Sequence, residues 1–404
     1  MSTHLTRSLL AGAALLTTAL LGRAALAAPL CSSLPNVLYL QVGDTQEPLM
    51  KALGKQLRES QVNPISIVYK TSGSCTNIDA MYTGTKLTTN PFYIPTTAED
   101  PTWDPSKPSP QCTIDPAGVT LDVVNSNVFV SACTQTPAPA GIGTFQGPVQ
   151  PYVFVVPKAS TQTAITAEEA YFAFGFGAAG KAEPWTDEAF FFIRTTTKST
   201  LLSMAAAIGV PAAKWKGVQY DKSTEVLNAV AMSTSPQKTI GILGAEIYDA
   251  NRATMSALAY QAFKQKHAFF PDSKATATDK QNVRDGHYTI WSPTVYLAPV
   301  DAQGVIKDAR ARYVVDMILA RTVAPVPDFD PLVTVISKGL VPDCAMKVTR
   351  SFEAGDLSLY TPAEPCGCFY ESKVGGASAS CKTCASDATC GGTSKCRHGF
   401  CEAK

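Results

Sequence analysis

Apolar residues in the first part of the chain form short runs that alternate with stretches of helical spacing. Residues 37–42 form an apolar run that predicts a strand, and leucines then recur at helical spacing through residue 57. Residues 63–70 predict a second strand, followed by a helix beginning near Cys75 or Thr76. This order of elements indicates an α/β fold with a mainly parallel sheet, in which ligands bind beyond the carboxyl ends of the strands.

The same patterns predict the later elements. Residues 82–116 are rich in Thr, Pro and Asp and predict an irregular insertion, and a Pro- and Gly-rich connection is expected just before residue 152. The predicted strands are 118–133, 152–157, 189–193, 239–244 and 288–298, and the predicted helices start near 165, 200, 223, 245 and 309, the fourth running through 263.

The chain is long enough for two lobes, since 404 residues exceed what one core usually encloses. We expect a first lobe from 28–150 and 285–345, a second lobe from 151–284, and a cysteine-rich C-terminal module from 346–404. Residues 1–27 have the layout of a secretory signal peptide, with Arg7, an apolar run and small residues before the cut. We therefore expect a periplasmic, extracellular or cell-surface protein.

The charge balance limits the kinds of partner that this chain can have. The 34 basic and 33 acidic residues nearly cancel, which argues against nucleic acid as a partner.

An exported chain with 12 cysteines predicts six disulfides. Seven of them lie in the C-terminal module, so at least one must pair with the body, and Cys344 with Cys366 or Cys368 is the expected link. A zinc or redox role for the CxxC at Cys381 and Cys384 is the alternative to plain bridges. The disulfide candidates are Cys31, Cys75, Cys112, Cys133, Cys344, Cys366, Cys368, Cys381, Cys384, Cys390, Cys396 and Cys401.

Two loops have the composition of an anion site. The first, Thr71–Ser74, ends a predicted strand and opens a helix with hydroxyls and free backbone N–H groups. The second begins at Arg194, at the end of an apolar strand, where a buried guanidinium needs an anionic partner; hydroxyls and Lys198 follow it. Alone, the first loop is more typical of an ordinary helix cap, and the second is equally typical of a cap and of a site. Together, one in each lobe, they favour a cradle for a tetrahedral oxyanion.

These motifs resemble the phosphate-binding proteins of bacterial ABC importers, which have the type 2 periplasmic binding fold. TSGSCTN stands where that family has a small-residue loop opening a helix, LDVVNSNVF resembles its next segment, and Trp185, Arg194 and TTTKST resemble the second-lobe motif. The resemblance spans roughly residues 36–334. It implies a two-lobed α/β fold that closes around a small anion, with an ABC transporter permease as a partner. It implies these ligand-facing residues: Thr45, Ser72, Gly73, Ser74, Asn127, Arg194, Lys198, Ser199 and Thr200.

The family's binding aspartate corresponds to Asn127, so the charge that selects protonated phosphate is missing. The expected ligand is therefore phosphate, a related oxyanion or a larger anionic molecule.

Catalytic and metal motifs are lacking in the sequence. The predicted mature chain has three histidines, none of them in an HExxH motif or beside a GxSxG motif. We therefore expect no enzyme activity, no metal site and no cofactor, which leaves a phosphate-ester hydrolase without support. The main hypothesis is an exported solute-binding protein. The alternative is a surface or matrix scaffold with a degenerate cleft, attached to a cell-surface partner through its cysteine-rich tail.

Overall fold

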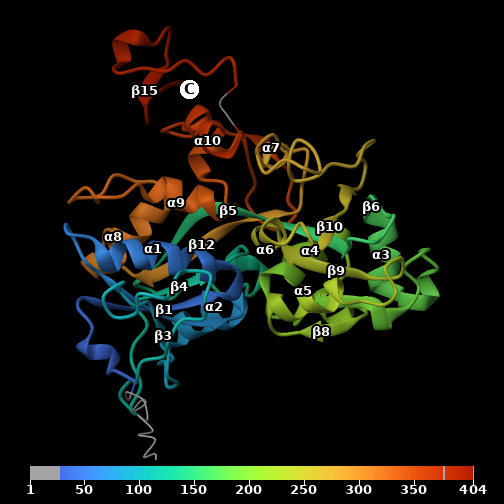
Figure 1. The fold of residues 1–404 in the computed structure, drawn as a ribbon, viewed down its shortest axis with the longest axis horizontal. Coiled ribbons are helices and arrows are strands. Elements are labelled where there is room, and N and C mark those ends of the chain that lie inside the picture. The colour runs from blue at the N-terminus through green and yellow to red at the C-terminus, as the bar shows by residue number, and fades with distance from the viewer. Residues whose placement is uncertain (1–27, 376–377, 404) are drawn as a thin grey trace, which may run out of the picture.

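The computed structural model describes residues 28–375 and 378–403, so the predicted signal peptide lies outside the described residues. Two lobes lie side by side and share one sheet, and the C-terminal residues form a smaller unit on one side of this body (Figure 1). The protein therefore has the expected two-lobed α/β fold with a disulfide-rich C-terminal region.

The first lobe contains the predicted N-terminal elements. Its strands are β1 (Val37–Gly43), β2 (Ser66–Ser72), β3 (Phe92–Tyr93), β4 (Val123–Ser126) and β12 (Trp291–Pro299), and its helices are α1 (Glu47–Glu59), α2 (Ser74–Thr83), α8 (Ala309–Ile318) and α9 (Pro331–Ser337). β1 is parallel to β2 and β4, so the loops after all three strands lie at one edge of the sheet. Of the predicted strand at 118–133 only β4 forms, and a short 3-10 helix follows at Val130–Ala132.

The second lobe contains a similar parallel group. Its strands are β6 (Ala164–Thr166), β7 (Phe191–Arg194), β8 (Val218–Tyr220), β9 (Ile240–Gly244), β10 (Met255–Ala257) and β11 (Ala259–Gln261), and its helices are α3 (Ala167–Phe176), α4 (Ser199–Ile208), α5 (Ser223–Ala231), α6 (Ala245–Ala250) and α7 (Gln281–Arg284). β7 is parallel to β8 and β9. Arg194 is the last residue of β7, and α4 begins five residues after it.

One long strand, β5 (Ile142–Pro157), joins the two lobes. Its first part pairs with β12 and its later part with β9 and β10, giving the strand order β3-β2-β1-β4-β12-β5-β9-β7-β8. The expected Pro- and Gly-rich connection extends only to residue 141, so the expectation is wrong for residues 142–151, which belong to β5. Glycine suits this strand because a β carbon on Gly147 would lie 2.8 Å from Oγ1 of Thr294, and one on Gly143 would collide with Val300.

The predicted helix over 245–263 is also wrong beyond its first turns. α6 ends at Ala250, and the chain then forms β10 and β11. β10 is antiparallel to the end of β5, and β11 is parallel to β6, so tertiary pairing overrides a sequence that favours a helix.

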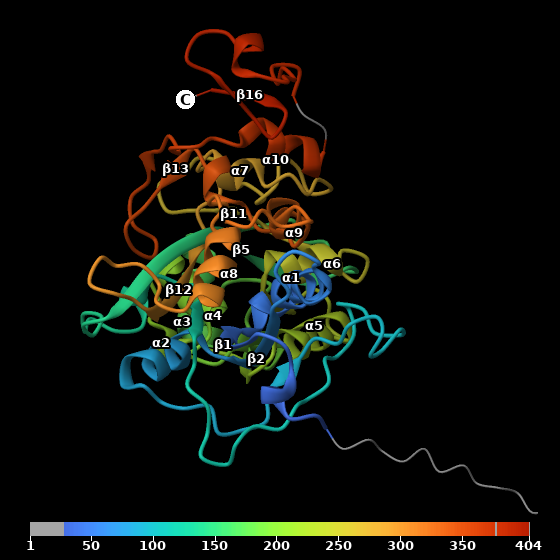
Figure 2. The ribbon, with the colours of Figure 1, turned by 90° about the vertical axis from the view of Figure 1, so that its left-hand side faces the viewer.

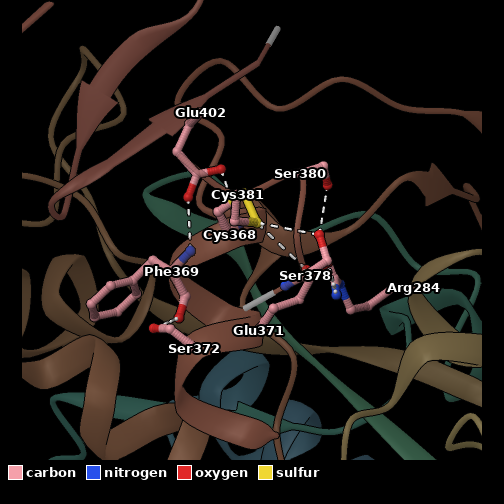
Figure 3. Close-up of a disulfide and its surroundings, with 9 residues drawn as sticks. All are labelled: Arg284, Cys368, Phe369, Glu371, Ser372, Ser378, Ser380, Cys381 and Glu402. Atoms are coloured by element: carbon pink, nitrogen blue, oxygen red, sulfur yellow. Dashed lines mark hydrogen bonds and ion pairs between the residues drawn. A yellow bond between two sulfur atoms is a disulfide. The ribbon is translucent and has the colours of Figure 1, made fainter. Parts of the chain in front are cut away.

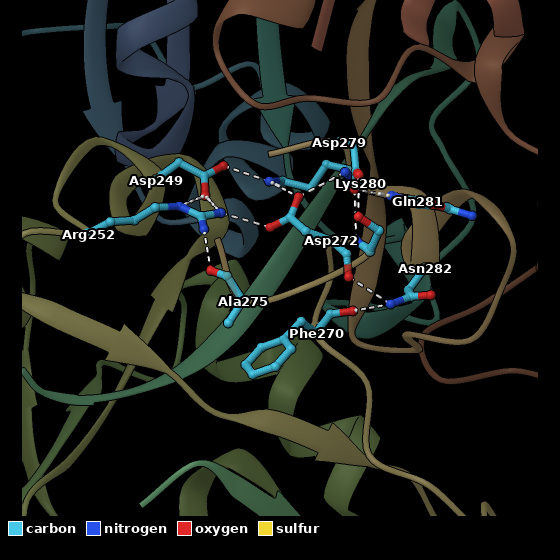
Figure 4. A network of polar contacts seen from close by, with 10 residues as sticks. Asp249, Arg252, Phe270, Asp272, Ala275, Asp279, Lys280, Gln281 and Asn282 are labelled. Carbon is cyan, nitrogen blue, oxygen red and sulfur yellow. Dashed lines mark hydrogen bonds and ion pairs between the residues drawn. The ribbon is translucent and has the colours of Figure 1, made fainter. Parts of the chain in front are cut away.

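The segment that follows β11 is attached to helix α6 by a buried ionic cluster (Figure 4). Nζ of Lys280 is 2.7 Å from Asp249 of α6 and 2.8 Å from Asp272, and Arg252 contacts both carboxylates. Lys280 is fully buried, as is nearly all of Asp272. The cluster therefore balances two carboxylates against two cations inside the protein.

All six predicted disulfides are present, and the described residues include no free cysteine. The pairs are Cys31–Cys112, Cys75–Cys133, Cys344–Cys366, Cys368–Cys381, Cys384–Cys396 and Cys390–Cys401. The predicted link between tail and body is confirmed, with Cys366 as the partner of Cys344. Cys381 and Cys384 pair with different cysteines, so their CxxC forms neither a zinc site nor a local redox bridge.

The C-terminal region has two parts. Its first elements are β13 (Val348–Thr349), β14 (Ser358–Leu359) and α10 (Gly367–Val374), and residues from Val348 to Tyr370 contribute to the core of the second lobe. The final part, with β15 (Lys395–Arg397) and β16 (Phe400–Glu402), projects away from the body (Figure 2). It is held to α10 by Cys368–Cys381 and by Glu402, which accepts hydrogen bonds from the backbone N–H groups of Cys368 and Phe369 (Figure 3).

Among the helices of residues 28–375 and 378–403, none combines the length and the apolar character that a membrane span requires.

Candidate functional site

The first-lobe half of the candidate site lies at the loops after β1, β2 and β4. Thr45 lies in the turn after β1, and Asn127 directly follows β4. Nδ2 of Asn127 donates to Oγ1 of Thr45, and the backbone N–H of Asn127 donates to Oγ of Ser74, at 3.1 Å. The parallel strands thus bring three of the predicted residues together, all of them buried.

Ser72 and Gly73 complete this half. Ser72 is the last residue of β2, and Gly73 precedes the first turn of α2. α2 therefore begins directly after the carboxyl end of β2, which is where an anion-binding loop is expected.

The second-lobe half comes from β7 and the start of α4. Lys198 is the N-cap residue of α4, while Ser199 and Thr200 form its first turn and are buried. Nζ of Lys198 is 3.0 Å from Oδ1 of Asp221, a largely exposed carboxylate. The ammonium charge of Lys198 is thus already paired within its own lobe.

The two halves touch each other. The backbone N–H of Cys75 in α2 donates to the backbone oxygen of Thr197 at 3.4 Å, and Gly73 lies against the same threonine. Thr197 is two residues before α4. The structure therefore brings the N-terminal ends of α2 and α4 together across the junction of the lobes.

Arg194 has the anionic partner that its burial requires, and that partner is Asp44 of the other lobe. The side chain of Arg194 is 0% exposed, and its Nη2 lies 2.9 Å from Oδ2 of Asp44. Asp44 also accepts hydrogen bonds from the backbone N–H and the hydroxyl of Ser223, at 3.0 and 2.9 Å. Burial by itself would raise the pKa of Asp44, but the charge and hydrogen bond of Arg194 and the backbone N–H of Ser223 outweigh it and lower the pKa.

Several buried polar atoms of the candidate site have no hydrogen-bond partner within the protein. These are Oδ1 of Asn127, Oγ1 of Thr195 and Oγ1 of Thr200. Leaving a buried polar group unpaired costs about 1–3 kcal/mol. Such groups are suited to donate to, or accept from, a bound polar molecule.

A polar chain continues from the site into the second lobe. Nε2 of Gln46 donates to Gln150 of β5 at 2.9 Å, and Nε2 of Gln150 donates to Glu246 of α6 at 2.9 Å. Oε1 of Glu246 is buried without a partner. Burial, followed by the nearby charge of Asp44, raises the pKa of Glu246 to about 8.

A second carboxylate reaches the junction from the C-terminal region. Glu353 accepts hydrogen bonds from the backbone N–H of Phe129 at 3.1 Å and from the hydroxyl of Ser292 at 2.5 Å. Burial raises the pKa of Glu353. Tyr152 of β5 lies nearby and donates to the backbone oxygen of Asn127 at 2.5 Å. The junction is therefore lined by more carboxylates than the sequence pattern indicates.

Sequence reasoning missed Asp44, Ser223, Glu246 and Glu353. Asp44 had a signal, because it stands beside Thr45 in a predicted binding loop and Arg194 needed a partner. Ser223 opens a predicted helix, as a capping serine does. Glu246 and Glu353 carry no local signal, since only the tertiary fold places them at the junction.

Metal binding has little to support it in the described part of the chain. The sulfur atoms of Cys384, Cys390 and Cys401 lie within 4.8 Å of one another, but all three residues are in disulfides. A disulfide sulfur is not a thiolate ligand.

No family model and no curated protein matches this chain. Among solved structures, it is similar to one described as a phosphate ABC transporter substrate-binding protein with bound phosphate from Clostridium perfringens, with a TM-score of 0.52 and 12% identity, covering 76% of this chain and 99% of that one. An ABC-type phosphate transport receptor from Vibrio cholerae has a TM-score of 0.47 and 12% identity, covering 75% and 99%. The OxyR regulatory domain from Pseudomonas aeruginosa has a TM-score of 0.40 and 10% identity, covering 70% and 96%. At 12% identity, the likeness to the Clostridium perfringens structure establishes the periplasmic-binding-protein-like fold that the sequence predicts, and no more.

Proposed function

We propose that this chain is an exported solute-binding protein that holds a small oxyanion, phosphate or a related one, between its lobes. Binding involves no covalent chemistry and consists of closure of the lobes around the ligand. An ABC transporter permease is the partner that this function implies, and the periplasm or the cell exterior is the expected location.

The observation that carries the proposal is the contact between the loops that open α2 and α4. The N–H of Cys75 bonds to Thr197 across the junction, which brings two positive helix ends together. Ser74 and Thr200 lie in the first turns of these helices and offer hydroxyls, and Asn127, directly after β4, offers an amide; all three are buried. A tetrahedral oxyanion needs many donors converging from several directions, and this junction supplies them from both lobes.

Thermal unfolding with phosphate, sulfate and organic phosphates tests the proposal. A ligand at about 100 times its Kd adds about 2.7 kcal/mol of stability, so the wild-type protein should show a clear rise in Tm with at least one anion. Thr200→Val removes one buried hydroxyl and should reduce that rise several-fold. Thr136→Val, at an exposed loop position, is the matched control and should respond like the wild type.

A scaffold or adhesion protein with a degenerate cleft is the second candidate. The observation in its favour is that both cations of the second-lobe loop are paired with protein carboxylates, Arg194 with Asp44 and Lys198 with Asp221. If no anion in the panel raises the Tm of the wild-type protein, the solute-binding proposal falls and the scaffold is favoured.

A further inference from the structure

The contacts of Asp44 are those of a bound ligand. Its carboxylate accepts from Nη2 of Arg194 at 2.9 and 3.1 Å, and from the N–H and hydroxyl of Ser223 at 3.0 and 2.9 Å. Ser223 is the first residue of α5, a nine-residue helix. A guanidinium, a hydroxyl and a backbone N–H at a helix start are together the donor set of an oxyanion site.

The donors and the acceptor come from different lobes. Asp44 follows β1 in the first lobe, whereas Arg194 ends β7 and Ser223 opens α5 in the second lobe. The ion pair is nearly withdrawn from solvent, since the side chains of Arg194 and Asp44 are 0% and 17% exposed. Opening of the lobes must therefore break this contact.

The guanidinium of Arg194 has hydrogen-bond partners other than Asp44. Nε of Arg194 also donates to the backbone oxygen of Tyr220 at 3.3 Å, and Nη2 donates to that of Asp221 at 2.6 Å. Both oxygens belong to the second lobe. The guanidinium is thus also held by its own lobe, and Asp44 is the only carboxylate to which it donates a hydrogen bond within the described residues.

We propose that Asp44 is an internal ligand of the Arg194–Ser223 cradle, and that a small oxyanion from solution binds this cradle only by displacing it. This inference rests on the proposed function and adds its regulation. The shared chemistry of the competing ligands is a pair of anionic oxygens, as in a carboxylate, phosphate or sulfate. A tethered competitor acts at a high effective concentration, so it lowers the apparent affinity for the free anion and favours the closed, unliganded form.

Calorimetric titration with phosphate and thermal unfolding with acetate test the inference in the full chain. Asp44→Ala should bind phosphate about 10-fold more tightly than the wild type, since 1.4 kcal/mol corresponds to a factor of ten. Acetate, which replaces the missing carboxylate, should raise the Tm of Asp44→Ala and leave that of the wild type unchanged. Asp79→Ala, which removes an exposed charge from α2 of the same lobe, is the control and should behave like the wild type.

Asp44→Asn keeps the shape of the side chain and serves if Asp44→Ala fails to fold; the same tightening is expected. Phosphate binding that is unchanged or weaker in the folded Asp44 variant overturns the inference, while anion binding by the wild type would still support the proposed function. Binding by the variant alone supports the internal ligand and contradicts solute binding by the native chain. If neither the wild type nor the Asp44 variant binds phosphate, both proposals are overturned.

Discussion

Gly73 of the first lobe lies so close to Thr197 of the second that a β carbon on Gly73 would be 2.6 Å from Oγ1 of Thr197 and 2.8 Å from its backbone oxygen. Real β carbons essentially never come within 3.0 Å of such atoms. The approach of the two loops therefore requires glycine at position 73. The backbone there is extended, with φ at −82°, so the requirement comes from space and not from backbone conformation.

Gly73→Ala should hold the lobes apart. The added methyl group forces Thr197 away, at a cost of about 1–3 kcal/mol for overpacking. We expect a larger radius of gyration by small-angle X-ray scattering and weaker anion-dependent stabilisation. Gly391→Ala is the matched control, because a β carbon there meets nothing within 4 Å. Identical scattering curves for the wild type and Gly73→Ala would show that the loops do not set the closed state.

Glu246 should make stability fall as the pH rises. Its pKa of about 8 in the folded protein lies above the ordinary value of 4.5, so folding takes up a proton between these two values. The free energy of unfolding should therefore decrease between about pH 5 and pH 8, by a few kcal/mol at most. Asp44 does not contribute in this window, because its lowered pKa means that its stabilisation is lost only under more acidic conditions.

Glu246→Gln is the variant that isolates this effect in urea unfolding at a series of pH values. A neutral amide does not titrate, so the variant should gain stability relative to the wild type as the pH rises from 5 to 8. The exposed Glu168→Gln should follow the wild-type profile. Parallel profiles for Glu246→Gln and the wild type would contradict the assignment of a raised pKa to Glu246.

Lys280→Met should destabilise the second lobe strongly. The substitution leaves Asp249 and Asp272 with Arg252 as the only cation of their cluster, and breaking a buried ion pair on one side costs about 3–5 kcal/mol. Urea unfolding measures the loss. Lys274→Met, at an exposed position of the same connection, should change stability by no more than about 0.5 kcal/mol. Equal stabilities for the two variants would mean that the cluster contributes little.

The sequence was sufficient wherever local pattern and tertiary role agree. The apolar run before Gly43 and the leucines through Leu57 predict β1 and α1, and the TSGSC segment predicts the start of α2. The even total of 12 cysteines predicts six disulfides, and the odd number in the tail predicts a disulfide between the tail and Cys344 of the body. Each of these features depends on residues close together in the chain or on simple counting.

The sequence failed where distant partners decide the outcome. Residues from Ile142 form a strand because β12 pairs with them, despite two glycines within six residues. Residues after Ala250 form the strands β10 and β11 instead of continuing the helix, because they pair with β5 and β6. Within the candidate site, Arg194 was identified, but its partner Asp44 is 150 residues away and is brought to it only by the packing of the lobes.

The location of a bound oxyanion is the most direct test of the account. Crystals grown with arsenate or selenate, which are tetrahedral and scatter anomalously, would reveal the anion in an anomalous difference map. We predict a peak at the junction of the lobes, within hydrogen-bond distance of Ser74, Thr200 or Arg194. A map with no peak at this junction, from crystals of folded protein at a saturating anion concentration, would contradict the proposal that the lobes hold an oxyanion between them.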